Sequence, residues 1–184
     1  IYHTKNMSDL INYMFDYNQK AKDEDKLSFY GFDMQNPEKS IDLILDFCKE
    51  NNILQEKDLK KELSFIKDEK IKISQIKDKE ALLLEIKAYA DALSSSDAKI
   101  ASRALTNVLN SIKYYELDFN DYVKVNTLRD ELMAENVKWI SDFEKSKGNK
   151  MLLISGHNGH IAKSEKFYEP MGSHLKKIFG EKYF

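Results

Sequence analysis

Several features that would place this chain in a particular class are scarce or missing. It has one cysteine among 184 residues, so an internal disulfide is impossible. No stretch approaches the roughly 20 consecutive apolar residues that span a bilayer, and the first residues show no signal-peptide pattern. We therefore expect a cytoplasmic protein that neither inserts into a membrane nor is exported.

An excess of one charge is also missing. Lysine and arginine total 29 against 31 aspartate and glutamate, and neither sign forms a long block. Charge therefore predicts no nucleic-acid partner, and it leaves the oligomeric state open. Hydrophobic residues make up 42% of the chain, which is typical of a folded globular protein, and the length predicts one domain over residues 1–184.

The single cysteine, Cys48, lies in an apolar run that begins at Ile41. A cysteine in such a run is usually a buried small hydrophobe, and the sequence places no base beside it that would activate a thiol. We therefore predict a core residue and not a nucleophile.

Apolar spacing predicts a helix-rich chain. Residues recur at helical intervals over 9–20, 37–50, 98–115 and 121–145, with capping residues near several of the starts. Between 52 and 95, leucine and isoleucine alternate with dense lysine and glutamate. This charged helical segment is expected to bury one stripe and expose the rest to solvent.

Two short apolar runs predict strands. Residues 26–32 are rich in aromatics, and residues 150–155 form the continuous run Lys-Met-Leu-Leu-Ile-Ser that is typical of parallel strands covered by helices on both faces. The expected fold class is therefore α/β, with parallel-type buried strands flanked by long helices.

Polar residues follow both predicted strands. Asp33 and Gln35 follow the first strand, and His157, Asn158 and His160 follow the second. Ligands of parallel sheets bind at the carboxyl ends of the strands. Histidine can transfer protons near neutral pH, and an asparagine can orient an imidazole or donate to an oxyanion.

The histidine pair leaves three interpretations open. It can belong to a catalytic or substrate-binding site, it can form structural hydrogen bonds, or it can bind a metal. A zinc site needs a third protein ligand, and the sequence offers none at an obvious spacing, so the expected metal and cofactor content is none.

Arg129 is the notable residue of the predicted helix 121–145. With Met133 and Asn136 it falls on one side of that helix. An arginine facing the core is costly unless it is paired. Its partner can be Asp130 or another acid of the fold, or an anionic catalytic group.

The chain resembles the erythromycin esterase family, which includes homologues named for succinoglycan biosynthesis. Four blocks carry the resemblance: Phe29-Tyr30-Gly31-Phe32-Asp33-Met34-Gln35, Arg129-Asp130 with Met133-Ala134-Glu135-Asn136, His157-Asn158-Gly159-His160, and Pro170-Met171-Gly172 with Leu175 and Gly180. The charged segment 52–95 does not contribute.

The resemblance implies a metal-independent hydrolase in which a histidine activates water to attack a carboxylic ester. The substrate of the named members is a macrolide lactone, which connects the family with antibiotic resistance. By position, His157, His160 and Arg129 correspond to catalytic residues. The implied substrate-binding residues are Asp33, Gln35, Asn158 and Glu135.

The chain departs from the family at one motif. The family's base histidine belongs to a Gly-Glu-x-x-His-Gly motif, and the residues around His3 do not match it. Ser155-Gly156 also replaces a Trp-Ala dipeptide that is common before the paired histidines. We therefore expect an incomplete domain whose base lies outside these residues. The alternatives are a non-catalytic binding or scaffold domain, or a metal-dependent hydrolase that uses the histidine pair.

Overall fold

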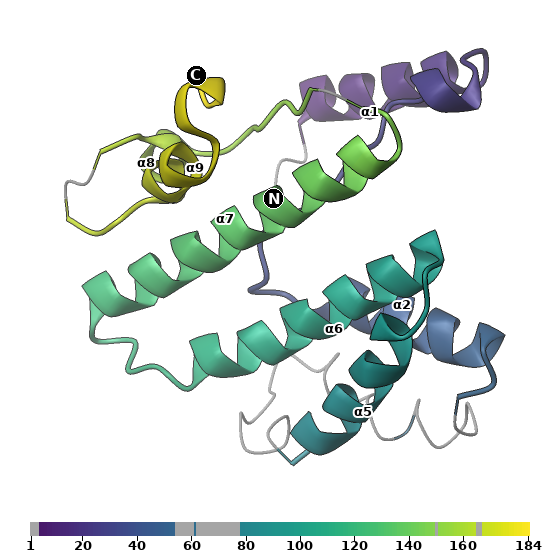
Figure 1. Cartoon of the computed structure of the whole chain (residues 1–184). Helices are drawn as coiled ribbons and strands as arrows, with labels where there is room; N and C mark the ends of the chain where they lie inside the picture. The colour runs from purple at the N-terminus through teal and green to yellow at the C-terminus, as the bar shows by residue number, and fades with distance from the viewer. Residues whose placement is uncertain (1–3, 54–60, 62–77, 150, 165–166) are drawn as a thin grey trace.

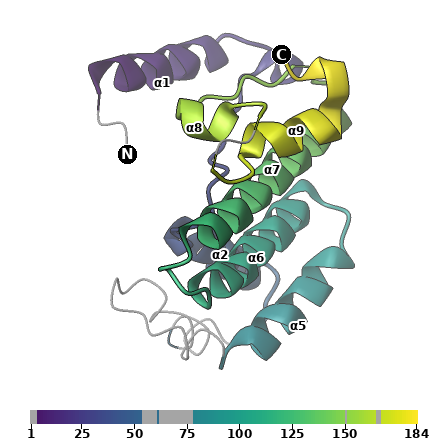
Figure 2. The same cartoon turned by 90° about the vertical axis from the view of Figure 1, so that its left-hand side faces the viewer.

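The computed structural model of the chain describes residues 4–53, 61, 78–149, 151–164 and 167–184. Its elements, in order, are α1 (Lys5–Asn18), η1 (Asp23–Asp25), α2 (Glu38–Glu50), α5 (Glu80–Asp91), α6 (Ser96–Tyr115), α7 (Tyr122–Ser146), α8 (Asn158–Ile161), α9 (Met171–Phe179) and η3 (Gly180–Lys182). Figure 1 shows α6 and α7 as an antiparallel hairpin. Helices α2 and α5 pack on α6, and α8 and α9 lie on the other side of α7 (Figures 1 and 2).

Local capping explains where the long helices begin and end. The Ser95 hydroxyl accepts a hydrogen bond from the Ala98 N–H at 3.1 Å, and the Asp121 carboxylate accepts one from the Lys124 N–H at 3.1 Å. After α7, Gly148 adopts φ = 97°, a left-handed conformation that glycine takes readily. The predicted helices over 98–115 and 121–145 are confirmed, and the first begins two residues earlier than predicted, at Ser96.

The core of α2, α5 and α6 is apolar. Small side chains on α6, Ala98, Ala101 and Ala104, let the neighbouring helices approach closely, and Leu105 is fully buried between them. Cys48 is 2% exposed within this core, and burial raises the pKa of its thiol to about 11. The predicted core role of this cysteine is therefore confirmed. Of the charged segment predicted over 52–95, residues 54–60 and 62–77 lie outside the described residues.

A second core joins α7 to α9. Met133, Ala134 and Val137 of α7 pack against Met171 and Leu175 of α9. This contact places the N-terminal end of α9 beside the middle of α7, where Arg129 and Asp130 also lie. In the part of the chain that the structure describes, no helix is long and apolar enough to cross a membrane.

The predicted α/β class is wrong for the described residues, which contain helices and no strand. Residues 26–32 and 151–155 form neither helix nor strand and pair with no backbone neighbour among the described residues; residue 150 of the second predicted strand lies outside them. Ile154 packs inward, whereas Met151 and Leu153 are 90% and 93% exposed. An apolar run favours an extended backbone, but a strand also needs a hydrogen-bonded partner, and the run does not specify one.

Hydrogen bonds from side chains, and not a sheet, hold residues 26–34 in position. The Asn18 amide accepts from the Leu27 N–H and donates to the Leu27 carbonyl, both at 2.8 Å. Asn136 of α7 donates to the Phe32 carbonyl at 2.8 Å. These bonds fix the segment that carries Asp33 against α7.

Candidate functional site

Two consecutive residues of α7, Arg129 and Asp130, form the floor of the site. Successive positions on a helix are about 100° apart, so Arg129 and Asp130 point in different directions. Asp130 is fully buried on the side that faces α9, and Arg129 is half-buried on the side that faces residue 33.

Arg129 forms an ion pair with Asp33. Its Nη2 donates to Asp33 Oδ2 at 2.6 Å, and its Nε donates to Oδ1 at 3.4 Å. The two side chains are 21% and 29% exposed. Partial burial disfavours the guanidinium charge, but the hydrogen bond and the charge of Asp33 outweigh it, and the pKa of Arg129 is raised. Asp33 is therefore the acid that balances this arginine.

His160 of α8 lies between the two residues of α7. Its Nδ1 is 2.8 Å and 3.0 Å from the two carboxylate oxygens of Asp130, and its Nε2 is 3.3 Å from Arg129 Nη1. Arginine is only a donor, so Nε2 must accept, and the proton must lie on Nδ1, where the Asp130 carboxylate accepts it. Its neighbours therefore favour the tautomer of His160 that carries the proton on Nδ1.

Asp130 has a second donor. The Met171 N–H at the start of α9 donates to Asp130 Oδ2 at 2.8 Å. Burial raises the pKa of Asp130, and the hydrogen bonds from His160 and Met171 lower it without cancelling the burial. The carboxyl group thus connects α7, α8 and α9 at a cost in desolvation.

His157 is exposed and has a different role in the structure. Its Nδ1 accepts a hydrogen bond from the Gly159 N–H at 3.1 Å, which caps the short helix α8. In the neutral imidazole the proton then lies on Nε2, which can donate toward solvent or a ligand. The ring centroids of His157 and His160 are 6.4 Å apart.

The other predicted site residues are more dispersed. Gln35 donates to the Tyr114 hydroxyl at 2.7 Å, so its side chain is already bonded. Asn158 is exposed at the start of α8. Glu135 is exposed on α7, where its charge acts on Arg103 and not on Arg129. The structure therefore brings Asp33, Arg129 and His160 into contact, with His157 nearby.

Sequence reasoning missed the role of Asp130. It considered this residue only as a salt-bridge partner for Arg129, whereas the structure pairs it with His160. The available signal was weak, because the sequence alone does not indicate which of two adjacent helical residues faces inward.

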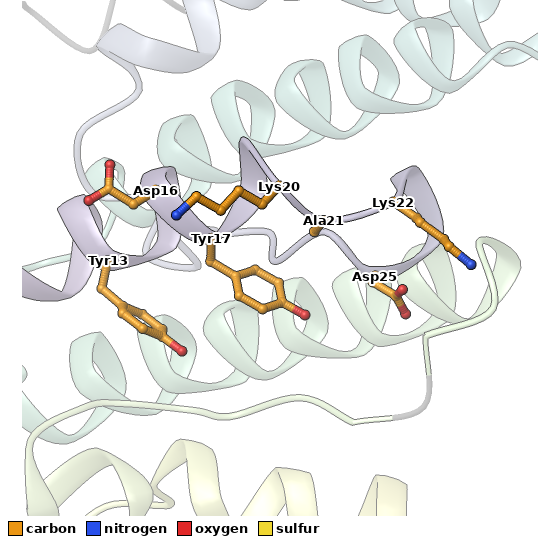
Figure 3. Close-up of a pocket in the computed structure, with 7 residues that line it drawn as sticks. All are labelled: Tyr13, Asp16, Tyr17, Lys20, Ala21, Lys22 and Asp25. Carbon is orange, nitrogen blue, oxygen red and sulfur yellow. The ribbon is translucent and has the colours of Figure 1, made fainter.

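A cavity of about 480 Å³ lies elsewhere, on α1 and the turn that follows it. Its lining residues are Tyr13, Asp16, Tyr17, Lys20, Ala21, Lys22 and Asp25, and Figure 3 shows both tyrosine rings on one side of α1. None of the predicted site residues lines it. Among the residues that the structure describes, no group of three or more His, Cys, Asp or Glu could hold a metal ion.

Comparisons with known proteins agree with the resemblance. A family model described as erythromycin esterase matches residues 1–184. A Bacillus cereus protein of known structure is 24% identical with a TM-score of 0.74, and the match covers 98% of this chain and 48% of that one. A succinoglycan biosynthesis protein is 22% identical with a TM-score of 0.67, covering 97% and 47%. No curated protein matches, and the chain spans about half the length of these two solved structures.

Proposed function

Because the chain belongs to the erythromycin esterase family, we propose that it forms one wall of a hydrolase site for carboxylic esters. The proposed catalytic residues are Arg129, His157 and His160. The family membership supports a hydrolase-type domain, and the described side chains support the particular roles.

The observation that carries the proposal is the continuous chain of contacts Asp33–Arg129–His160–Asp130. Desolvating charged groups costs free energy, and apolar residues of the same volume often give equal or greater stability. The three charged side chains and one imidazole of this chain of contacts come from α7, α8 and residue 33. Joining the helices through them therefore costs more free energy than apolar contacts would. Arg129 and Asp130 both have raised pKa values, and perturbed ionisable groups that orient one another favour a functional site.

The donor and acceptor pattern suggests a role for each group. Arg129 has N–H groups beyond those that contact Asp33 and His160, and these can stabilise negative charge on a carbonyl oxygen. His157 offers Nε2–H as a donor to substrate. The lone pair of His157 is bonded to Gly159 and that of His160 faces Arg129, so neither histidine is arranged to take a proton from water. We place the general base outside the described residues.

We propose a small-molecule ester or lactone as the substrate and place a general carboxylic-ester role before hydrolysis of erythromycin itself. Asp33, Gln35, Asn158 and Glu135 are the proposed substrate-binding residues, and Asp33 also fixes Arg129. A cytoplasmic location is likewise a proposal.

Hydrolysis of p-nitrophenyl butyrate and of erythromycin by the purified protein tests this function. Arg129→Met and His157→Ala should each lower kcat/KM about 100-fold or more, as is usual when a donor to an oxyanion is removed. His174→Gln on α9 is the matched control, because the His174 Nε2 forms no hydrogen bond with the described residues and lies 3.9 Å from Glu169 Oε2, which is not part of the site. Circular dichroism melts should show that all three variants are folded. Turnover by folded Arg129→Met equal to that of the unmodified protein would overturn the assignment.

One observation favours a second function. Because neither histidine of the pair offers a free base, the chain is also suited to bind an ester without cleaving it. A binding domain would retain the intact ester at equilibrium, with an affinity that Arg129→Met lowers. Release of the alcohol product by the unmodified protein excludes this alternative.

A further inference from the structure

Tyr168 lies at the same site but belongs to none of the motifs that identified it. It precedes Met171, whose N–H binds Asp130, and its half-buried ring packs edge-on against Tyr122 with centroids 6.0 Å apart. Tyr122 is the first residue of α7, the helix that carries Arg129. The Tyr168 ring is therefore held between the start of α7 and the start of α9.

Gly172 fixes the position of the segment that carries Tyr168. A Cβ atom at Gly172 would overlap the carbonyl oxygens of Ile161 and Ala162, far inside van der Waals contact. With no side chain there, the first turn of α9 lies directly against the end of α8. The residues just before α9, including Tyr168, are thereby held over α8.

Gly159 lies close to both Tyr168 and His157. The point where a Cβ atom of residue 159 would stand is 3.2 Å from His157 Nδ1 and 3.9 Å from Tyr168 Oη. A side chain at residue 159 would crowd the imidazole, so the glycine of the His-Asn-Gly-His motif keeps such a side chain out of the region between His157 and Tyr168.

The Tyr168 hydroxyl forms no hydrogen bond with any residue that the structure describes. Other half-buried tyrosines are bonded: Tyr115 Oη donates to the Gln35 carbonyl at 2.6 Å and Tyr183 Oη to the Ile161 carbonyl at 2.8 Å. Tyr168 Oη is not among the polar atoms that are sealed from solvent without a partner, so a ligand that displaces water can accept a hydrogen bond from it. Burial, together with the charge of Asp130, raises the pKa of Tyr168, which keeps the phenol protonated as a donor.

We propose that Tyr168 is a further catalytic residue, whose hydroxyl donates a hydrogen bond to the carbonyl oxygen of the ester. This inference rests on the proposed function. When the water oxygen bonds to the carbonyl carbon, the C=O π pair moves onto the carbonyl oxygen, and the Tyr168 O–H stabilises that charge without giving up its proton. The general base, which we place outside the described residues, takes the proton that the water releases. The C=O bond then re-forms as the bond to the alcohol oxygen breaks, and the base passes that proton to the departing alkoxide.

Tyr168→Phe tests the proposal because it removes the hydroxyl and keeps the ring contact with Tyr122. With p-nitrophenyl butyrate, kcat should fall about 100-fold, as for other oxyanion donors, while KM stays within about twofold. The matched control is Tyr122→Phe, which removes the neighbouring hydroxyl from a ring that is 61% exposed and should leave kcat unchanged. A kcat in Tyr168→Phe within about threefold of the unmodified protein would overturn the proposal.

A binding measurement separates this inference from the proposed function. An alkylphosphonate monoester resembles the charged tetrahedral intermediate, and its Kd should rise about tenfold in Tyr168→Phe and not in Tyr122→Phe. If the unmodified protein hydrolyses no ester, the proposed function fails, but a Kd that depends on the Tyr168 hydroxyl still supports the donor role. Equal Kd values for the unmodified protein and Tyr168→Phe overturn that role whatever the hydrolysis assay gives.

Discussion

The two sides of the α6–α7 hairpin are held together by different chemistry. Against α6, the buried residues that the structure describes in α2 and α5 are all apolar, and the hydrogen bond from Ser102 of α6 to Asp91 of α5 lies at the exposed edge. Against α7, the contacts with α8 and α9 include the buried carboxyl of Asp130 and the partly buried Arg129 and His160. Both buried charged side chains of the described chain, Asp130 and Glu144, belong to α7.

This difference indicates which side supplies stability and which supplies chemistry. Apolar burial stabilises without directional demands, so α2, α5 and α6 can act as a support whose details matter little to the site. The α7 side keeps polar groups in fixed orientations, which costs desolvation but places donors and acceptors at the proposed site. Substitutions on the two sides should therefore change different measurements.

The largest expected effect on stability comes from Leu105→Ala on α6. Leu105 is fully buried, so the substitution leaves a cavity and should lower the free energy of unfolding by about 2–5 kcal/mol. Denaturant titration gives this value. The comparison predicts that kcat of the folded variant is unchanged, and a loss of kcat as large as that in Arg129→Met would contradict the division between the two sides.

A smaller loss of stability, coupled to a loss of activity, is expected for Gly172→Ala. The added methyl group overlaps two backbone carbonyls and pushes α9 from α8, at a cost of about 1–3 kcal/mol. The Met171 N–H and Tyr168 should move with α9, so kcat should fall as well. Gly31→Ala is the matched control, because its Cβ would meet nothing within 4 Å. Equal melting temperatures for the two variants would show that α8 and α9 are not in close contact.

The smallest of the three effects is a change in pH dependence. The pKa of Asp130 is raised on folding, so its contribution to stability is present below its unfolded pKa and is lost as pH rises through the folded value. As pH rises from about 3 to 6, where carboxyl groups titrate, the unmodified protein should therefore lose stability relative to Asp130→Asn. Asp142 gives the opposite sign, because Lys138 lowers its pKa. As pH rises over the same range, the unmodified protein should become more stable relative to Asp142→Asn. If the stability difference between unmodified protein and variant changed with pH in the same direction for both substitutions, folding would not raise the pKa of Asp130.

The sequence predicted the helices better than the remaining structure. The helices at 98–115 and 121–145 were predictable because their apolar period is long and their ends carry local signals, including Gly148. The strands at 26–32 and 150–155 were not, because pairing depends on residues far along the chain. Leu153 illustrates the failure, since its sequence context predicted burial and it is 93% exposed.

The site was predictable in its members and not in its connections. Arg129, Asp33 and His160 were identified by spacing and by the family resemblance. Their contacts depend on which way two adjacent residues of α7 point, and a helix with apolar residues on several sides leaves that open. Tyr168 carried no signal, because one tyrosine in a loop resembles any other until its neighbours are known.

The two contacts of His160 have a consequence for the entropy of binding. Rotating the imidazole by 180° would place carbon atoms against Asp130 and Arg129, so the ring has one acceptable orientation. Freedom that a side chain loses on folding does not have to be lost again when a ligand arrives. The His160 imidazole is thus already fixed in orientation before a substrate binds. The desolvation free energy of Asp130 is the cost of fixing it in the free protein.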